Sequence, residues 1–439
     1  MKRLHAIINA YTSVTGTQKP VDSVSILNII QSFLEARVDI NACCSQGETA
    51  LYRASKAGYG QIVRLLLEAG ADTSDTTSRR SLYAACEHGH TEIVGLLLHY
   101  GADPNASPFY PALPLCCAVD KSHTDIINLL LEHGADVNKD GGSGESALIA
   151  FLELMIYRRT EIPEPSNPVE EKYLNILRSM LVAGGDANII SRRFTGKNAF
   201  HMASSFGMCD VMMELIQHGA DCNQLTSSRK SALDLACEKG HEGAVELLLK
   251  NGADPNRGIC FNYEVYGSRQ STMPTLCTAA KSGSETMVKM LLKHGANVSD
   301  SDQNGNTALH LAASNAIIQT LLNAGANINA MNDDGKTVLS LFCEKRQLAD
   351  AKVVETLLKF NADPNTAFPL HVSCQNDNIN TVRLLLAYGA DANLVTAKST
   401  SERFVISDSD NDDDDDMWMS DRRTPVKVIM PSPLSIYCM

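Results

Sequence analysis

Residues 230–256 read KSALDLACEKGHEGAVELLLKNGADPN, and near copies of this stretch recur along the chain. Ser231 carries a hydroxyl that can accept hydrogen bonds from the free backbone N–H groups at a helix start. In the second half of the stretch, the apolar residues lie three and four positions apart, as on one face of a helix. Gly252 can adopt the left-handed conformation that ends a helix without a Cβ clash. The stretch therefore predicts two short helices joined by a turn.

The closing phrase Gly-Ala-Asp-x-Asn recurs with a period of about 33 residues, which is typical of a repeat array. A lone helix pair cannot bury its apolar face, whereas pairs stacked in file cover one another. We therefore expect about ten to eleven helix pairs over residues 21–393, after an N-terminal segment of residues 1–20. The glycine of the phrase, or the residue in its place, stands at Arg37, Gly70, Gly101, Gly134, Gly184, Gly219, Gly252, Gly295, Gly325, Asn361 and Gly389.

A second phrase precedes each closing glycine by about twenty residues, as in Thr307-Ala308-Leu309-His310. It resembles the T-P-L-H-x-A motif of the ankyrin repeat family, whose period is 33 residues. The resemblance covers residues 21–393 and implies an all-α fold, an ankyrin-repeat α-solenoid of helix-turn-helix units with β-hairpin or loop connections. His201, His310 and His371 occupy the histidine position of the motif. They are expected to bridge backbone groups between adjacent repeats.

Some parts of the array depart from the pattern. Arg37 stands in the glycine position of a repeat that lacks the T-P-L-H phrase, so residues 21–41 are interpreted as an N-terminal cap. Asn361 also replaces glycine, and asparagine is the next-best left-handed residue. Two insertions break the period. Prolines near residues 157–172 predict an exposed loop, and alternating aromatics near residues 257–270 predict a β-hairpin. The inward-facing cap residues are expected to be Ile26, Leu27, Ile30, Phe33 and Leu34.

Composition and charge limit the classes of function that the chain can have. The chain has 439 residues, 13 cysteines and a net charge of −13. No stretch approaches the roughly 18–20 consecutive apolar residues that cross a bilayer, and His5 and Asn9 interrupt the N-terminal apolar stretch too early for a signal peptide. Scattered cysteines in odd number indicate reduced thiols and an intracellular protein, cytoplasmic, nuclear or both. The acidic balance disfavours nucleic acid and favours a basic protein segment as partner.

Two groups of residues have the composition of zinc ligands. We interpret their cysteines as small core residues and their histidines as turn residues of the repeat, because both fall on repeat positions. No nucleophile elbow, phosphate-binding loop or metalloprotease motif occurs in the sequence. The sequence therefore predicts no metal, no cofactor and no enzymatic activity. The two groups are Cys86, His88 and His90, and Cys116, Cys117 and His123.

The resemblance implies a concave recognition face on the hairpin tips and on the exposed side of each first helix. Exposed aromatic residues are typical anchors of binding hot spots; the alternative is that some of these rings pack against the insertions. We expect a non-catalytic scaffold or adaptor that binds a partner protein segment on this face. A substrate-recognition subunit of a ubiquitin ligase and a regulatory inhibitor of a nuclear or signalling protein stay open as alternatives. The register places on the face Arg79, Tyr83, Glu87, His88, Phe109, Tyr110, Arg193, Phe194, Phe206, Lys230, Asp234, Glu238, Lys239, Phe261, Tyr263, Tyr266, Asp333 and Asp334.

Residues 394–439 are rich in Ser, Asp and Pro and contain five consecutive acids, so we expect a disordered acidic tail. Phe404, Val405 and Ile406 precede the acidic run. This arrangement resembles a SUMO-interacting motif, in which the apolar residues add a strand to the partner's sheet. Ser407 and Ser409 each have an acid three residues on, the pattern of an acidophilic kinase site. A plain solubilising tail is the alternative.

Overall fold

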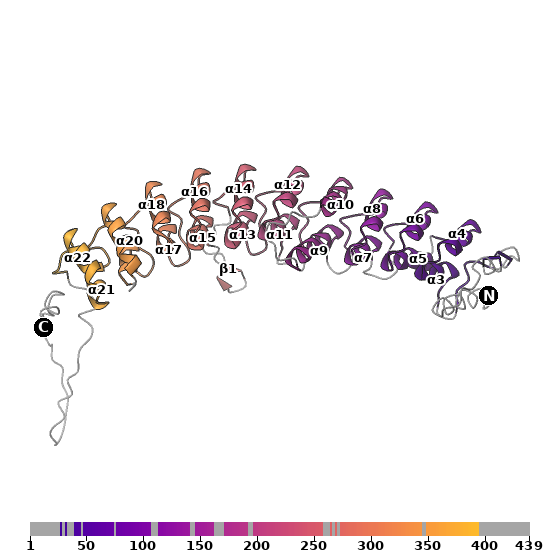
Figure 1. Ribbon diagram of the computed structural model, residues 1–439, viewed down its shortest axis with the longest axis horizontal. Helices are drawn as coiled ribbons and strands as arrows, with labels where there is room; N and C mark the ends of the chain where they lie inside the picture. Colours follow the sequence, from indigo (N-terminus) through magenta and orange to yellow (C-terminus); the bar gives the residue numbers. More distant parts are fainter. Residues whose placement is uncertain are drawn as a thin grey trace, which may run out of the picture. The chain divides into compact units, whose positions relative to one another are not determined.

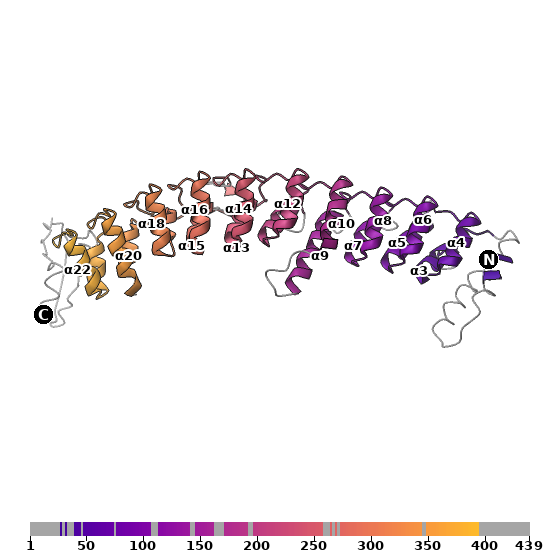
Figure 2. The same cartoon turned by 45° about the horizontal axis from the view of Figure 1, so that its top comes forward.

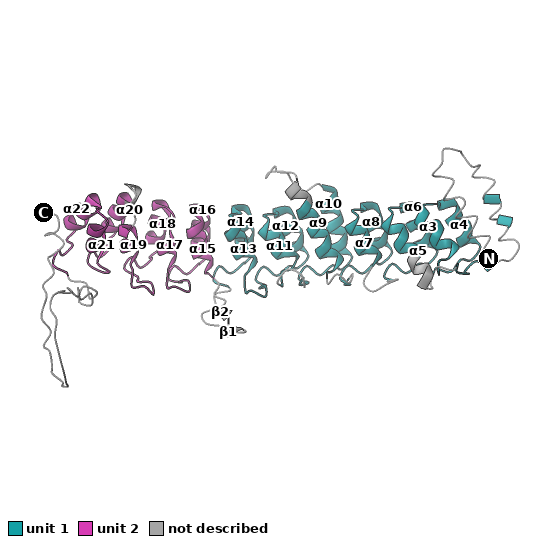
Figure 3. Ribbon diagram, turned by 90° about the horizontal axis from the view of Figure 1, so that it is seen from below, with its two compact units in different colours: residues 1–258 teal, residues 259–439 magenta. Residues whose placement is uncertain are grey.

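The structure is a computed structural model of the 439-residue chain. It describes residues 27–28, 31–32, 39–44, 47–73, 76–106, 113–140, 145–161, 171–191, 196–257, 264–265, 268–269, 273–344 and 348–394. The chain divides into two compact units, Met1–Gly258 and Ile259–Met439 (Figure 3).

Unit 1 consists of helix pairs in which first helices pack on first helices and second helices on second helices (Figure 1). This two-layer packing confirms the stacking that the repeat pattern predicts. The first helices are α3 (Ala50–Ala57), α5 (Thr76–Glu87), α7 (Pro114–Asp120), α9 (Ala147–Glu161), α11 (Ala199–Ser205) and α13 (Ala232–Lys239). The second helices are α4 (Gly60–Glu68), α6 (Thr91–His99), α8 (Thr124–Glu132), α10 (Glu171–Val182), α12 (Cys209–Gln217) and α14 (Glu242–Lys250).

Unit 2 repeats the arrangement. Two short strands, β1 (Glu264–Val265) and β2 (Ser268–Arg269), pair antiparallel, with Glu264 opposite Arg269. They agree with the β-hairpin predicted in this insertion. The first helices of unit 2 are α15 (Thr275–Ser282), α17 (Ala308–Leu311), α19 (Val338–Glu344) and α21 (Pro369–Gln375). Its second helices are α16 (Glu285–Lys293), α18 (Asn315–Asn323), α20 (Leu348–Lys359) and α22 (Ile379–Ala387).

Local sequence signals start and end these helices as expected. The Ser231 hydroxyl accepts a hydrogen bond from the Asp234 backbone N–H (3.1 Å), and the Asp234 carboxylate accepts one from the Ser231 backbone N–H (2.8 Å). This reciprocal pair is a capping box. Gly252 closes its repeat with φ +84°, and Asn361 takes the same left-handed conformation with φ +63°. Asparagine therefore replaces the glycine with little strain.

The core lies between neighbouring helix pairs. Val245 and Leu248 of α14 are fully buried, as are the small residues Ala236 and Cys237 of α13. Small side chains on the first helices let adjacent helices approach closely, while branched side chains fill the space between the layers. Each fully buried leucine or valine contributes about 1.5–3 kcal/mol relative to an exposed one.

Asparagines of the Asp-x-Asn turns join consecutive repeats in unit 1. The Asn138 Oδ1 accepts a hydrogen bond from the Asp186 backbone N–H (2.7 Å), and its Nδ2 donates to the Gly184 carbonyl (2.8 Å). The motif predicted a turn here, and the link to the next repeat is a second role. The same pair of bonds is made by Asn105 to Asp136 and Gly134, by Asn188 to Asp221 and Gly219, and by Asn223 to Asp254 and Gly252. We call these four residues the asparagine ladder.

Two expectations need correction or stay untested. The insertion at residues 157–172 was predicted as a loop from Tyr157 onward, but α9 continues to Glu161 and α10 begins at Glu171. The helix continues because good helix formers precede the first proline, Pro163. Leu27 of the predicted cap is half-buried. The other cap residues, Ile26, Ile30, Phe33, Leu34 and Arg37, lie outside the described residues.

Candidate functional site

Histidines carry contacts between repeats. His201 is buried on α11, and its Nε2 lies 2.9 Å from the Gln224 carbonyl of the next repeat. His310 makes the same contact to the Lys336 carbonyl at 3.2 Å. The bridging role is therefore confirmed for these two. The Nε2 of His371 lies 2.9 Å from the Gln375 Nε2 on its own helix. Because α21 is the last first helix that the structure describes, a bridge from His371 to a following repeat stays a prediction.

The cysteines that had the composition of metal ligands lie mainly in the core. Cys86 is fully buried and Cys117 nearly so. Burial raises the pKa of the Cys117 thiol to about 11 and that of Cys116 to about 12, which disfavours the thiolate that a metal needs. His90 Nε2 lies 3.2 Å from the Lys56 carbonyl of the preceding repeat. Within the described part of the chain, no three His, Cys, Asp or Glu residues are grouped as metal ligands.

The predicted recognition residues fall into separate groups in the structure. Glu87, His88, Phe206, Glu238, Lys239, Asp333 and Asp334 are exposed. Lys230 is half-buried and forms an ion pair with Glu238. Tyr83 is half-buried as well, and burial together with a hydrogen bond that its hydroxyl donates to Cys117 raises its pKa. The exposed residues thus remain candidates for recognition.

Asp234 corrects the predicted surface. Its side chain is only 6% exposed, because its carboxylate closes the capping box with Ser231. The fourth position of the motif can carry any side chain that accepts this backbone N–H, and His310 takes the same place in α17. Asp234 therefore stabilises the start of α13 and is not available to a partner.

Other predicted residues lie outside the part of the chain whose side chains are described. These are Arg79, Phe109, Tyr110, Arg193, Phe194, Phe261, Tyr263 and Tyr266 of the array, and Phe404, Val405, Ile406, Ser407 and Ser409 of the tail. Their roles stay predictions.

Each first helix in unit 1 has an exposed side chain in its C-terminal half or just after its end. Tyr157 on α9 is 60% exposed, and Phe206 at the end of the neighbouring α11 is 41% exposed. Figure 2 shows α9 extending beyond the adjacent α7 and α11. Sequence reasoning missed Tyr157 because it placed this residue in a loop. We call these six residues the first-helix ridge: Lys56, Glu87, Asp120, Tyr157, Phe206 and Glu238, all exposed.

The opposite layer of unit 1 carries a surface groove of about 840 Å³ between α8 and α10. Asp125 and Lys172 line it, together with Val182, which is 74% exposed. Arg178 also lines the groove, but its guanidinium forms an ion pair with Glu214 of α12. Arg178 is therefore committed to the contact between α10 and α12. Among the helices that the structure describes, none has the length and apolar character that a bilayer crossing requires.

Parts of this chain are similar in sequence or structure to known proteins. Human neurogenic locus notch homolog protein 2 is 25% identical over 155 residues, which are 35% of this chain and 6% of that protein. The E3 ubiquitin-protein ligase XBAT32 of Arabidopsis thaliana is 31% identical over 174 residues, which are 39% of this chain and 32% of that protein. The matches thus span less than a third of each relative. The crystal structure of the ankyrin repeat domain of Bcl-3 matches with 22% identity and a TM-score of 0.41, covering 55% of this chain and 97% of that one.

Family models cover most of the array. The model for three ankyrin repeats matches residues 23–108, 169–258, 262–332 and 313–396. The model for a single ankyrin repeat matches residues 113–141. Because these matches extend over well more than half of the sequence, the chain belongs to the ankyrin repeat family.

Proposed function

We propose that the protein is a non-catalytic scaffold or adaptor that binds a segment of another protein on the first-helix ridge. Ankyrin repeats are modules that bind other proteins and typically carry no catalytic activity. Two points go beyond this general role: which surface of the chain binds, and which kind of segment it binds. The observation that carries it is the exposure of Tyr157 and Phe206 on neighbouring first helices.

Large exposed aromatic rings need a reason, because most apolar side chains of unit 1 are buried between the helices. Tyrosine and phenylalanine bury much area with little loss of side-chain entropy, which makes them effective anchors in interfaces. Stacked helices also hold these rings in place before a partner arrives. Little ordering entropy is therefore lost on the side of the receptor.

Charge favours a basic partner. The whole chain has 51 acidic and 38 basic residues, a net charge of −13. Such a balance attracts cationic peptides and repels phosphate backbones. We therefore propose a basic segment as the ligand, with affinity that falls as salt rises.

A displayed library of random peptides tests the surface and requires no named partner. Peptides are selected on the full chain and then measured against Tyr157→Ala/Phe206→Ala. Val182→Ala/Met213→Ala, which trims exposed apolar residues of the second-helix layer, is the matched control. We expect enriched basic peptides whose affinity falls at least tenfold with the ridge variant and stays unchanged with the control. Peptides that bind all three proteins equally, or lose affinity only for the control variant, would contradict the proposal.

A ubiquitin-ligase role is a second candidate, supported by the 31% identity to XBAT32 over 174 residues. In that case the array would select the substrate. Purified chain incubated with ubiquitin, activating enzyme and a panel of conjugating enzymes would form ubiquitin conjugates, with or without added cullin complexes. No conjugates under any of these conditions would reject the ligase role and leave the scaffold role intact.

The tail offers a further binding element under the same proposal. Phe404, Val405 and Ile406 would pair with a SUMO sheet edge, and phosphorylation of Ser407 and Ser409 would add negative charge beside the acidic run. Titration of labelled SUMO into the full chain and into Val405→Asp/Ile406→Asp tests this element. Equal affinities for both proteins would reject it.

A further inference from the structure

The last repeat that the structure describes leaves open an apolar face that inner repeats cover. Leu386 of α22 is 37% exposed, whereas Leu358, at the same position of α20, is 3% exposed. Val382 is half-buried, whereas the corresponding Val354 is fully buried. We aligned α20 and α22 by the residues that close their repeats, Asn361 and Gly389. The difference therefore reflects what packs on each repeat.

The first helix of the same repeat shows the same difference. Cys374 of α21 is half-buried, while Cys343, the sixth residue of α19 as Cys374 is of α21, is fully buried. In the inner repeat, α21 packs on α19 and α22 packs on α20. We call Cys374, Val382 and Leu386 the terminal face. A following repeat would pack its first helix on α21, over Cys374, and the rest of the repeat beside Val382 and Leu386.

The sequence beyond the described residues contains a segment whose residue pattern matches that of a first helix. Residues 423–430 read RTPVKVIM, and residues 336–343, which start and fill α19, read KTVLSLFC. In both segments a basic residue and a threonine are followed, in this order, by two apolar residues, one polar residue and three apolar residues. Pro425 would take the first helical position, where proline is favoured. The chain already uses proline there, with Pro114 in α7 and Pro369 in α21.

A long insertion separates this segment from the last closing glycine, Gly389. The chain accepts such an insertion at the same place elsewhere, since residues 257–272 stand between the turn after Gly252 and α15. The acidic residues between 395 and 422 would then form a connection inside the array. A segment tethered in this way has an effective concentration near the millimolar range. It therefore has an advantage over a second copy of the chain at ordinary concentrations.

We propose that residues 424–430 form a capping helix that packs on the terminal face and buries Cys374. Val426, Ile429 and Met430 would supply the apolar contacts, at the positions of Leu339, Phe342 and Cys343 in α19. These three α19 residues are at most 6% exposed. The proposal replaces the expectation that all of residues 394–439 are disordered, and it does not depend on the proposed binding function.

Thiol labelling of the native full-length protein tests the cap. The rate of Cys374 modification by N-ethylmaleimide is measured by peptide mass spectrometry in the wild type and in Val426→Asp/Ile429→Asp. Phe404→Asp/Ile406→Asp is the matched control, because it introduces the same charges into the insertion. Cys343 serves as the internal reference for a buried thiol.

We expect Cys374 to react at least tenfold faster in Val426→Asp/Ile429→Asp than in the wild type, and the control variant to behave as the wild type. Equal rates in the wild type and Val426→Asp/Ile429→Asp, whether fast or slow, would overturn the proposal. So would acceleration by the control variant, which would place residues 404–406 on the face. Wild-type protection that is lost on dilution would also overturn it, because a second copy would then be the occupant.

Discussion

Units 1 and 2 are built from the same helix pair, but their consecutive repeats are joined by different polar contacts. In unit 1 the asparagine ladder satisfies both a backbone N–H and a carbonyl of each following turn. In unit 2, Ser299 replaces asparagine at one position of the ladder. At two further positions, Asn329 accepts a hydrogen bond from the Asp363 backbone N–H, and Asn365 accepts one from the Asp391 backbone N–H. Polar links thus differ while the apolar packing is shared.

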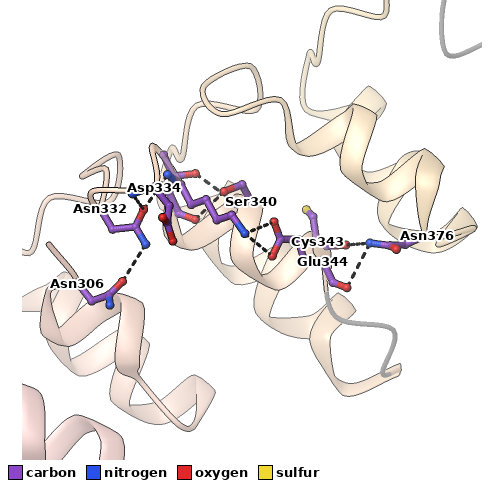
Figure 4. A network of polar contacts seen from close by, with 9 residues as sticks. Asn306, Asn332, Asp334, Ser340, Cys343, Glu344 and Asn376 are labelled. Carbon is purple, nitrogen blue, oxygen red and sulfur yellow. Dashed lines mark hydrogen bonds and ion pairs between the residues drawn. The ribbon is translucent and has the colours of Figure 1, made fainter. Parts of the chain in front are cut away.

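Unit 2 places other links at the hairpin tips and helix ends (Figure 4). Asn332 donates from its Nδ2 to the Asn306 Oδ1 of the preceding repeat (2.9 Å). Asn376 donates from its Nδ2 to the Glu344 carbonyl at the end of α19 (3.2 Å). Side chains that satisfy either a backbone group or a side-chain amide of the neighbouring repeat can therefore link consecutive repeats. The apolar core supplies most of the stability in both units.

The largest expected effect tests whether the core is equivalent in the two units. Leu215 of α12 and Leu291 of α16 occupy the seventh position of their helices, and both are fully buried. Leu215→Ala and Leu291→Ala should each lower the free energy of unfolding by about 2–5 kcal/mol, through lost burial and the cavity left behind. Urea unfolding followed by circular dichroism measures both. A near-neutral effect in either unit would break the equivalence.

The next effect is a pH dependence in the bridging histidines. Burial lowers the pKa of His201 to about 4, below its value of about 6.5 in the unfolded chain. As the pH falls between these values, the unfolded chain gains a proton and the folded chain does not. The stabilisation is therefore complete above about pH 6.5 and is lost toward pH 4, by about 3 kcal/mol.

His201→Gln should flatten this part of the stability profile, measured by urea unfolding between pH 4 and 7. Burial lowers the pKa of His310 in unit 2 as well, and that side chain is more exposed than His201. His310→Gln should therefore flatten the profile less. Unchanged profiles in both variants would show that other groups cause the acid sensitivity.

A smaller effect separates the two kinds of link. Asn138→Ala removes two hydrogen bonds to the next repeat and should cost about 2 kcal/mol. Asn365→Ala removes the bond to the Asp391 backbone N–H and should cost about 1 kcal/mol. Differential scanning calorimetry compares the variants. Equal costs would mean that the donor half of the ladder contributes nothing to stability.

The smallest effect concerns an ion pair that both units share. Lys230 pairs with Glu238 in unit 1, and Lys336 pairs with Glu344 in unit 2 at the same repeat positions. Both pairs are partly exposed, so Lys230→Met and Lys336→Met should each change the free energy of unfolding by less than about 1 kcal/mol. A larger loss in one unit, seen in the same urea experiment, would indicate that its pair belongs to a cooperative network.

Sequence reasoning predicted the features that each repeat encodes by itself. The closing glycines, the cap at Ser231 and the small buried residue Cys237 follow from local backbone geometry and side-chain size. The left-handed conformation of Asn361 follows for the same reason. The helix caps and closing turns do not depend on neighbouring repeats, whereas Cys237 is buried by them at a position that the repeat pattern assigns to a small residue.

What the sequence did not predict depends on contacts beyond the local pattern. The second role of Asn138 needs the turn of the next repeat within reach of its side chain. Asp234 stands at a position that the register assigns to the surface, and its contact with Ser231 buries it. The prolines after Tyr157 predict that a helix ends before them, but they do not determine how far α9 extends toward them. Candidate surface residues are therefore harder to predict than the helices that carry them.

Native-state hydrogen exchange of Leu215→Ala tests most directly the central claim that each repeat is stabilised by its immediate neighbours. Amide protection should fall in α10, α12 and α14, the second helices in contact around the cavity, while α3 and α4 at the other end of unit 1 keep their wild-type protection. An equal loss of protection in α3 and α4 would contradict this claim.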